Sequence, residues 1–430
     1  MRSGHEAYII TMNNLDKCVD PHLAKRNQDA DNSGELIGNL RISIIDHIDE
    51  LKKYADAWNT LSYKVPPQLP TSSYAWVSTY FEHSLIAGET WRCIFAYNND
   101  RLVGVLPLIV SRRAKAGLAW LSTPMSSHII AVSPLLFPGE ESDVLRALLN
   151  AAWSSHPDVV WIEMSDLAAN SPLLEYVDDY LHLKISRRTG RYLRVDGNQD
   201  QYQSSLSRNF RSNQRKAANK LRKLKGMETA FVTGRDASSA QLSEFIPVEA
   251  SGWKGRRGTA IQKSSDLITF YATLTARFAD AGWLEWHFLR AEGRAIAANL
   301  AVHFNRSIIV WKLGYDENYR RYSPGGMLFQ FLLDRVFADP DIDEINLLTN
   351  ASWYDNWKME KREYYRIRFY KKQRPLSILF GFIPNGLVNI PRRSLVDISR
   401  RSKTVRSVLR TGRRWMSVLR PSSVASQKTG

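Results

Sequence analysis

Hydrophobic residues recur along this chain with two periods, one close to two residues and one close to 3.6. Near the start of the patterned region, Leu51, Tyr54 and Trp58 are spaced as on one face of a helix. SSYAWVSTYFEHSL predicts a second helix, with Ser72 or Ser73 as its N-cap. The strand-like runs WRCIFAY and RLVGVLPLIV then flank the turn sequence NND, which predicts a β-hairpin.

The same order of elements is predicted twice. The first unit continues with strands LAWLS and IIAVSPLLF, helix 140–155, strand 158–165, helix 171–179, and strands near 181–186 and 190–195. The second contains a basic helix 204–225, strand METAFVT, helix 237–249, loop SGWKGRRGTAI, helix 265–281, a three-strand meander, helix 325–338, strand 343–349, the aromatic helix SWYDNWK, and strand 364–370. The repeated order predicts a tandem duplication of one mixed α/β fold.

Changes in composition suggest four parts, namely a polar leader at 1–39, two similar halves at 40–200 and 201–373, and a basic tail at 374–430. The N-terminus has no continuous apolar run of the kind that a secretory signal contains. No stretch of ~18–20 apolar residues is present, so no membrane-spanning helix is expected. These features predict a cytoplasmic protein, peripheral at the inner face of the membrane if the tail binds lipid.

Charge is distributed unevenly along the 430 residues. The net charge of +16 comes from 59 basic and 43 acidic residues, but 374–430 alone holds twelve Lys/Arg and one acid, and 204–226 holds eight and none. The remaining residues are slightly acidic, which argues against DNA as a partner. Residues 394–420 predict a basic amphipathic helix for an anionic membrane surface, or a helix that packs on its own domain.

The most informative segment is SIIVWKLGYDENYRRYSPGGMLFQFLLDRVF, in which a β-branched strand, a polar loop and an apolar helix follow one another. Gly325 and Gly326 permit close approach of a ligand to the backbone, and Pro324 suits the first turn of a helix. The free N–H groups of that turn favour a phosphate, and Arg320 and Arg321 can pair with further phosphate oxygens. An ordinary loop before a capped helix is the alternative.

Several stretches together resemble the GNAT (Gcn5-related N-acetyltransferase) superfamily. They are YADAWNTL, SSYAWVSTYF, NDRLVGVLPLIV, LSRNFRSNQRKAANKLRKL, VEASGWKGRRGTAI, WKLGYDENYRRYSPGGML and WYDNWK. They look like the CelD-like subgroup, which is linked to bacterial cellulose and exopolysaccharide biosynthesis, and the resemblance spans about Leu40 to Lys372. It implies a tandem GNAT architecture, as in FemAB-like proteins. The implied donor is acetyl-CoA or another acyl-CoA, and the implied acceptor is a glycan or its sugar precursor.

By this resemblance, the loop before the apolar helix binds the pyrophosphate of CoA. The implied binding residues are Arg320, Arg321, Tyr322, Ser323, Gly325, Gly326 and Met327. The usual loop reads Arg/Gln-x-x-Gly-x-Gly/Ala. This sequence departs from it, because Pro324 occupies the place of the first glycine.

Acyl transfer from a thioester needs an uncharged nucleophile and a group that accepts its proton. The chain has no Gly-x-Ser-x-Gly motif, which favours direct attack in a ternary complex over a covalent enzyme intermediate. Glu249, Glu285 and Asp316 are the candidate bases. The resemblance implies that Tyr354 protonates the leaving thiolate, and core packing with the neighbouring tryptophans is the alternative.

The loop SGWKGRRGTAI combines three glycines with three cations. Lys254, Arg256 and Arg257 can close over an anionic acceptor or over CoA, and Trp253 can stack on a sugar. A basic surface loop is the alternative. Asp341 and Asp343 resemble the Asp-x-Asp pair of metal-dependent glycosyltransferases, but their place after Pro340 at the start of a strand favours a turn. No other His, Cys or paired carboxylate sits at ligand spacing, so no metal is expected.

Two other functions fit the same sequence. A FemAB-like transferase would use aminoacyl-tRNA, which the cations of 204–226 would hold, although those cations also suit CoA phosphates, an anionic glycan or plain solvent. A non-enzymatic scaffold of a polysaccharide synthase would use the tail as its anchor.

Overall fold

The computed structural model describes residues 35–37, 39–66, 69–113, 118–125 and 132–370. The expected tail helix at 394–420 and most of the expected leader lie outside these residues. Glu35–Ile37, which the sequence assigned to the leader, forms strand β1 and pairs with β2. Among the described residues, no helix has the length and apolar character needed to cross a membrane.

The two halves repeat the predicted order of elements. The first contains β1 (Glu35–Ile37), β2 (Leu40–Ile45), α1 (Ile48–Leu51), α2 (Ala55–Lys64), α3 (Tyr74–His83), β3 (Thr90–Asn98), β4 (Arg101–Arg113), β5 (Leu118–Ser122), β6 (Leu135–Leu136), α4 (Glu141–Ser155), β7 (Val159–Ala168), α5 (Leu173–Tyr176) and β8 (Leu181–Arg194). The second contains α6 (Gln199–Ser205), α7 (Arg208–Leu221), β9 (Glu228–Val232), α8 (Leu242–Ala250), α9 (Trp253–Arg256), α10 (Ser265–Asp280), β10 (Leu284–Ala291), β11 (Arg294–Phe304), β12 (Ser307–Tyr315), α11 (Pro324–Ala338), β13 (Glu344–Asn346) and β14 (Glu360–Tyr370).

Local sequence explains most element boundaries. Ser73 caps α3 by accepting a hydrogen bond from the backbone N–H of Trp76, and Ser207 caps α7 in the same way. Two strands were predicted near 181–186 and 190–195, but β8 is one strand of 14 residues. All residues of β14 pair with β8, from Leu181 to Tyr192. This pairing keeps the polar middle of β8 extended.

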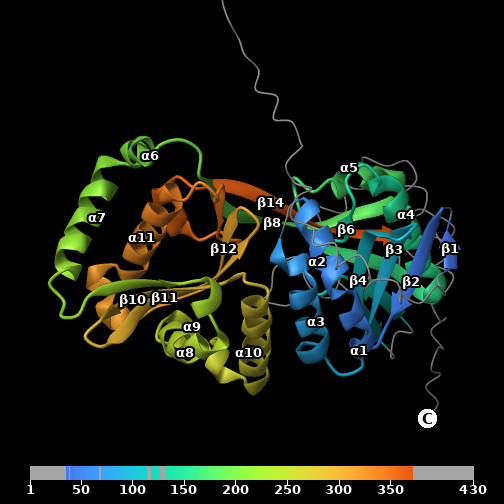
Figure 1. Ribbon diagram of the computed structural model, residues 1–430, viewed down its shortest axis with the longest axis horizontal. Helices are drawn as coiled ribbons and strands as arrows, with labels where there is room; N and C mark the ends of the chain where they lie inside the picture. Colours follow the sequence, from blue (N-terminus) through green and yellow to red (C-terminus); the bar gives the residue numbers. More distant parts are fainter. Residues whose placement is uncertain (1–34, 38, 67–68, 114–117, 126–131, 371–430) are drawn as a thin grey trace, which may run out of the picture.

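One mixed sheet runs through the whole molecule, in the order β1-β2-β3-β4-β5-β7-β14-β8-β13-β12-β11-β10-β9. β14, the last strand of the chain that the structure describes, lies between β7 and β8, whereas β8 pairs with β13 of the second half. Figure 1 shows these two strands at the centre, between the two groups of helices. The halves have therefore exchanged their last strands, and the expected division at 200/201 falls inside α6.

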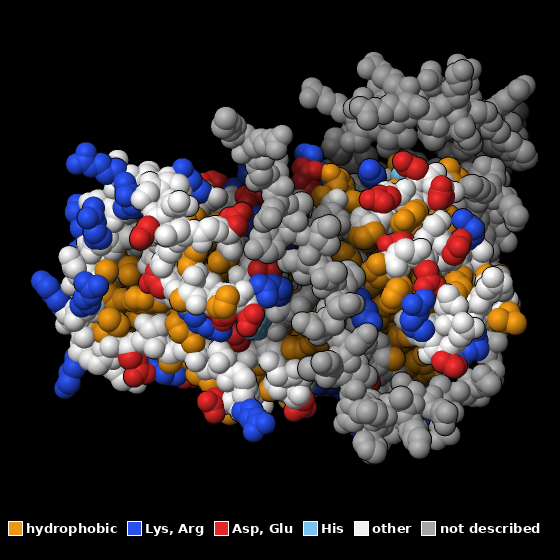
Figure 2. Space-filling model, turned by 45° about the horizontal axis from the view of Figure 1, so that its top comes forward, with side chains coloured by type: hydrophobic (Ala, Val, Ile, Leu, Met, Phe, Trp, Pro, Cys, Tyr) orange, Lys and Arg blue, Asp and Glu red, His pale blue; other side chains and the backbone are white. Residues whose placement is uncertain are grey.

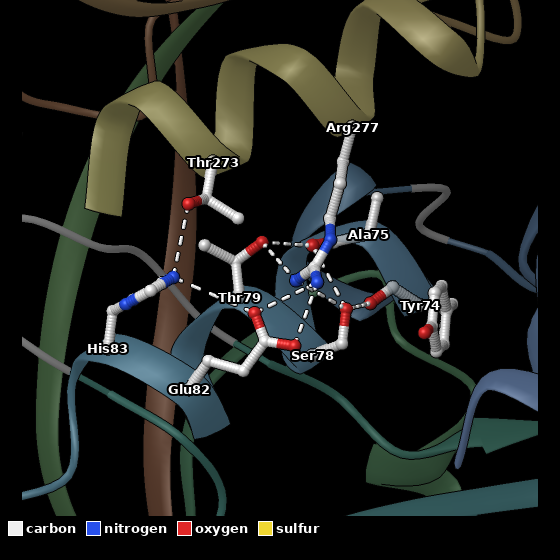
Figure 3. A network of polar contacts seen from close by, with 8 residues as sticks. All are labelled: Tyr74, Ala75, Ser78, Thr79, Glu82, His83, Thr273 and Arg277. Carbon is white, nitrogen blue, oxygen red and sulfur yellow. Dashed lines mark hydrogen bonds and ion pairs between the residues drawn. The ribbon is translucent and has the colours of Figure 1, made fainter. Parts of the chain in front are cut away.

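The exchange also joins the cores. Ile367 and Phe369 of β14 are fully buried among the side chains of the first half, and Leu193 of β8 is buried in the core of the second. A separate contact joins α3 to α10, where the Arg277 guanidinium donates two hydrogen bonds of 2.8 Å to the Glu82 carboxylate and two of 3.0 Å to the hydroxyls of Ser78 and Thr79 (Figure 3).

Candidate active site

The site lies where β12 and β13 stop pairing. β12 pairs with β11 along its length, but its parallel pairing with β13 is limited to Ser307–Ile309. A register shift places Trp311 as an extra residue between the pairs Leu300–Lys312 and Ala301–Val310. Bulges of this kind bend a strand and redirect its side chains. Beyond Ile309 a gap is therefore left at the edge of β12.

This gap is a cavity of about 360 Å³, which we call the donor cavity. Apolar side chains from β12, from α11 and from the 3₁₀ turn η9 (Ser352–Trp357) form most of its walls. Polar side chains lie at its mouth. The lining residues are Phe210, Gln214, Asn299, Val310, Leu313, Gly314, Tyr315, Arg320, Ser323, Pro324, Gly325, Gly326, Phe329, Leu347, Trp353, Asn356 and Trp357.

The N-terminus of α11 opens onto the donor cavity. Ser323 adopts a left-handed conformation, with φ of 52°, and its side chain does not cap the helix. No acidic residue occupies the first turn, so the backbone N–H groups of Gly325 and Gly326 have no carboxylate beside them there. The positive end of the helix favours an anion at this point. A Cβ on Gly326 would lie 2.9 Å from Ser323 Oγ, so a side chain at this position would require the Ser323 hydroxyl to move.

The first half lacks such a helix end. α4 occupies the equivalent place, but Glu141 and Asp143 stand in its first turn. Glu140 at its N-cap accepts a hydrogen bond of 2.8 Å from Asn98 and forms an ion pair with Arg101. Carboxylates thus already occupy the positive end of this helix.

The residues expected to bind pyrophosphate divide into two groups. Four of the seven line the donor cavity, namely Arg320, Ser323, Gly325 and Gly326. The other three do not line this cavity. Arg321 donates a hydrogen bond of 2.7 Å to the Tyr322 hydroxyl, and Met327 is 3% exposed in the core under α7.

The loop expected to bind the acceptor contains the short helix α9. Side-chain hydrogen bonds hold it against β12 and the turn that follows β12. Lys254 Nζ donates a hydrogen bond of 2.8 Å to the carbonyl oxygen of Leu313, a residue of the cavity wall. The Arg256 guanidinium donates two hydrogen bonds to the Glu317 carboxylate. This pairing raises the pKa of Arg256 and lowers that of Glu317.

Trp253 and Arg257 are the outer residues of this loop. Trp253 is 51% exposed, and the Arg257 guanidinium lies 5.4 Å from the centre of its ring. A Cβ on Gly255 would lie 2.0 Å from the carbonyl oxygen of Ala250, so the loop needs glycine there.

None of the three candidate bases lines the donor cavity, and the described residues bring no other Asp or Glu to its wall. Glu249 is 2% exposed, with its carboxylate 3.2 Å from Lys254 Nζ and 3.1 Å from the backbone N–H of Ile261. Its backbone packs against Gly314 of the wall, where a Cβ would lie 2.7 Å from the Glu249 Cα. Glu249 is thus next to the cavity but on the other face of β12.

Glu285 is held by an ion-pair cluster. Arg335 of α11 donates hydrogen bonds of 2.6 and 2.8 Å to its carboxylate, and His287 Nε2 lies 2.9 Å from it. Burial by itself raises the pKa of Glu285. The hydrogen bonds from Arg335, His287 and His303 outweigh burial and hold the pKa well below its usual range. Glu285 is therefore ionised and poorly suited to accept a proton.

Asp316 and Tyr354 have partners that the sequence did not indicate. Asp316 caps the 3₁₀ turn η8 (Glu317–Tyr322) through a 3.0 Å hydrogen bond from the backbone N–H of Asn318, and Arg294 lies 3.3 Å from its carboxylate. Tyr354 is 2% exposed, and its hydroxyl shares a 3.1 Å hydrogen bond with Thr349. Burial raises the pKa of Tyr354.

Sequence reasoning missed the polar residues of the cavity wall, which are Gln214, Asn299, Tyr315 and Asn356. Asn299 is 7% exposed, and its amide nitrogen lies 3.5 Å from Nδ1 of His287, the residue that contacts Glu285. A single amide within the apolar run AIAANLAV was a usable signal, because buried polar groups require partners. Among the described residues there is no group of three or more potential metal ligands.

A family model described as "Acetyltransferase (GNAT) domain" matches residues 208–359, which include α7, the donor cavity and α9. The crystal structure of FemX is similar over 78% of this chain and 99% of FemX, with a TM-score of 0.55 and 11% identity. A tandem GNAT protein from the clavulanic acid biosynthesis pathway aligns over 77% of this chain and 98% of its own, with a TM-score of 0.45 and 10% identity.

No functionally curated protein matches the sequence. At 11% identity, the likeness to FemX establishes a shared fold and leaves the substrate open. Residues 208–359, in the second half of the chain, match a GNAT acetyltransferase domain, and this domain indicates an acyltransferase enzyme.

Proposed function

We propose that the protein transfers an acyl group from acyl-CoA, in the simplest case acetyl-CoA, to a glycan of the cell envelope or exopolysaccharide, or to a precursor of such a glycan. The observation that carries the proposal is the acid-free N-terminus of α11, which opens with Arg320 onto an apolar cavity of about 360 Å³. The volume lies within the range of about 300–1,000 Å³ that small-molecule sites occupy.

Different parts of the cavity suit the pyrophosphate and the pantetheine arm of such a donor. The backbone N–H groups of Gly325 and Gly326, together with Arg320, suit the pyrophosphate. The apolar wall formed by Val310, Leu313 and its neighbours suits the pantetheine arm, whose amides find polar partners among the side chains of the wall. Arg320 lines the cavity and forms no ion pair within the described part of the chain, although its charge helps Arg256 to lower the pKa of Glu317.

The reaction in this proposal is direct attack by a neutral hydroxyl or amine on the thioester carbonyl. The new C–O or C–N bond forms, the C–S bond breaks, and CoA leaves as a thiolate that takes up a proton. Of the candidate bases, Glu249 lies next to the cavity through its backbone, which packs on Gly314 of the wall. The Glu249 carboxylate, however, pairs with Lys254 on the other face of β12, so we assign the proton transfer to none of the three. We assign no step to Tyr354, since its hydroxyl is already bonded to Thr349.

The acceptor assignment rests on the resemblance to CelD-like sequences and on the loop that carries Trp253. With 51% of its surface exposed, Trp253 offers an aromatic face of the kind that stacks on sugars. Lys254, Arg256 and Arg257 surround it with positive charge, although Lys254 and Arg256 already pair with carboxylates.

A FemAB-like use of aminoacyl-tRNA is the second candidate, and the charge of α7 favours it. Arg208, Arg211 and Arg215 begin a run of eight cations through Lys225, and none of them forms an ion pair with a described residue. Figure 2 shows Lys and Arg side chains gathered at the end of the molecule where α7 lies.

Isothermal titration of the full chain with acetyl-CoA tests the proposal. We expect saturable binding by the wild type and at least tenfold weaker binding by Gly326→Glu, because the new carboxylate would occupy the anion position at the end of α11. Ser142→Glu is the matched control, since it adds the same charge to the first turn of α4, and it should bind as the wild type does.

Two results would contradict the proposal. One is the absence of saturable heat with folded wild-type protein, and the other is unchanged affinity in Gly326→Glu. A gel shift with tRNA at physiological salt, without binding of acetyl-CoA, would support the second candidate instead.

A further inference from the structure

A second hollow adjoins the donor cavity. α7 and α11 lie side by side at one end of the molecule (Figure 1), and a groove of about 350 Å³ runs between them. We call it the α7 groove. It is lined by Gln203, Leu206, Phe210, Arg211, Gln214, Arg215, Ala218, Met327 and Gln330.

The α7 groove is positively charged and has no acidic lining residue. Arg211 and Arg215 lie one helical turn apart and both face it. The Nε atom of Arg211 is buried and has no hydrogen-bond partner in the described structure. Buried polar atoms without partners are uncommon and costly, so this atom points to a ligand group that the chain itself does not supply.

The groove and the donor cavity are continuous along one wall. Phe210 and Gln214 line both of them, so one ligand can occupy both. Gly326 belongs to the cavity and Gln330 to the groove, and the helix rises about 6 Å between these two residues. In coenzyme A one ribose carries both the pyrophosphate and the 3′-phosphate, so these two groups stay close together.

We propose that the α7 groove binds the 3′-phosphorylated ADP end of the donor, and that Arg211 and Arg215 pair with its 3′-phosphate. The proposal rests on the function proposed above and goes further, because it names the part of the donor that α7 recognises. A phosphomonoester carries up to two negative charges and three acceptor oxygens, which matches two guanidinium groups one turn apart.

The groove favours a mononucleotide end over a long RNA. It is a small hollow between two helices that continues directly into the donor cavity. The cations Lys216, Lys220 and Lys223 lie outside its lining and are exposed. An extended RNA would use these outward cations as well, whereas a 3′-phosphate needs only the two that line the groove.

The test compares coenzyme A with 3′-dephospho-coenzyme A by isothermal titration of the full chain. We expect the wild type to bind coenzyme A at least tenfold more tightly. The double variant Arg211→Gln/Arg215→Gln should bind both ligands equally, with about the affinity of the wild type for the dephospho ligand. Lys220→Gln/Lys223→Gln is the control, because it removes the same charge from exposed positions of the same segment, and it should keep the wild-type ratio.

Two results would overturn the inference and leave the proposed function standing. One is equal binding of the two ligands by the wild type. The other is a double variant that keeps the wild-type ratio of affinities for coenzyme A and 3′-dephospho-coenzyme A. No saturable binding of either ligand would remove the proposed function and the inference with it. If the wild type does not discriminate but Arg211→Gln/Arg215→Gln loses a gel shift with tRNA, the groove serves RNA and the inference is wrong.

Discussion

At the residue scale, Lys312 of β12 is a buried titratable group with a lowered pKa. Its ammonium group lies 5.7 Å from the centre of the Tyr271 ring, in a layer shared with Glu249 and Lys254 on the face of β12 opposite the donor cavity. Burial, and then the like charge of Lys254, lower the pKa of Lys312 to about 8, against the opposing attraction of Glu249. With a pKa of about 8, Lys312 changes its charge in the folded protein near that pH.

The lowered pKa of Lys312 predicts how stability depends on pH. Between pH 8 and 10.5 the unfolded chain binds more protons at this residue than the folded chain does, so this residue's contribution to folding rises with pH. Relative to Lys312→Met, the wild type should gain about 2–3 kcal/mol in free energy of unfolding between pH 7 and pH 10. Urea denaturation at several pH values measures this difference.

The exposed residue Lys220 provides the control for that measurement. Lys220→Met should track the wild type at every pH, because Lys220 is exposed and its side chain is surrounded by water in both the folded and the unfolded chain. A difference between wild type and Lys312→Met that does not change with pH would contradict the prediction.

At the element scale, the contact between α3 and α10 shows how two helices from different halves are held together. Arg277 of α10 binds Glu82, Ser78 and Thr79 of α3, and Thr273 lies 3.1 Å from Nε2 of His83 (Figure 3). These residues are polar members of otherwise buried helix faces. Hydrogen bonds to charged groups contribute roughly 1.5–3 kcal/mol each when they are shielded from water.

Replacing Arg277 by alanine should therefore lower the free energy of unfolding by about 2–3 kcal/mol, because the Glu82 carboxylate loses two charged hydrogen bonds and the hydroxyls of Ser78 and Thr79 each lose a donor. Denaturant unfolding followed by circular dichroism measures the loss. Arg146→Ala is the comparison, since its ion pair with Asp143 lies exposed on α4, and it should cost less than about 1 kcal/mol. Equal losses in free energy of unfolding would show that the α3–α10 network stabilises the protein no more than an exposed ion pair does.

At the scale of the whole molecule, the exchange of β8 and β14 makes the two halves one folding unit. β14 fills the core of the first half with Ile367 and Phe369, and β8 lies against β13 in the second half. Each half without the other would expose strand edges and part of its core. The site depends on this arrangement, because the donor cavity lies beside β13, which has only three residues and is held between β12 and β8.

Fragments 35–200 and 201–370 should not fold when they are expressed separately. The first would lack β14, and the second would lack β8, which pairs with both β13 and β14. We expect aggregated or non-cooperatively unfolding material for each fragment alone, and a 1:1 complex after co-expression. Size-exclusion chromatography and thermal unfolding give the result. A monomeric second fragment with a cooperative transition would contradict this picture.

Much of the candidate site was predictable because its signals are local. The strand, arginine loop and glycine pair that lead into α11 are consecutive in the sequence, so Arg320, Gly325 and Gly326 could be expected together. The same local reasoning could not place Met327, which packs against α7 and lines the α7 groove instead of the donor cavity. It also missed Asn299, which comes from a different strand.

The sequence by itself determined most secondary elements, their repeated order and the acid-free, glycine-bearing first turn of α11. These properties depend on hydrophobic period, capping residues and turn chemistry, which act over a few residues. Only the tertiary structure decided that β8 and β14 exchange places, that Glu285 is bound by Arg335, and that α7 forms a groove with α11. The pairing partner of a strand and the neighbours of a charged side chain are set by packing between segments far apart in the chain. A pattern of a few consecutive residues does not predict that packing.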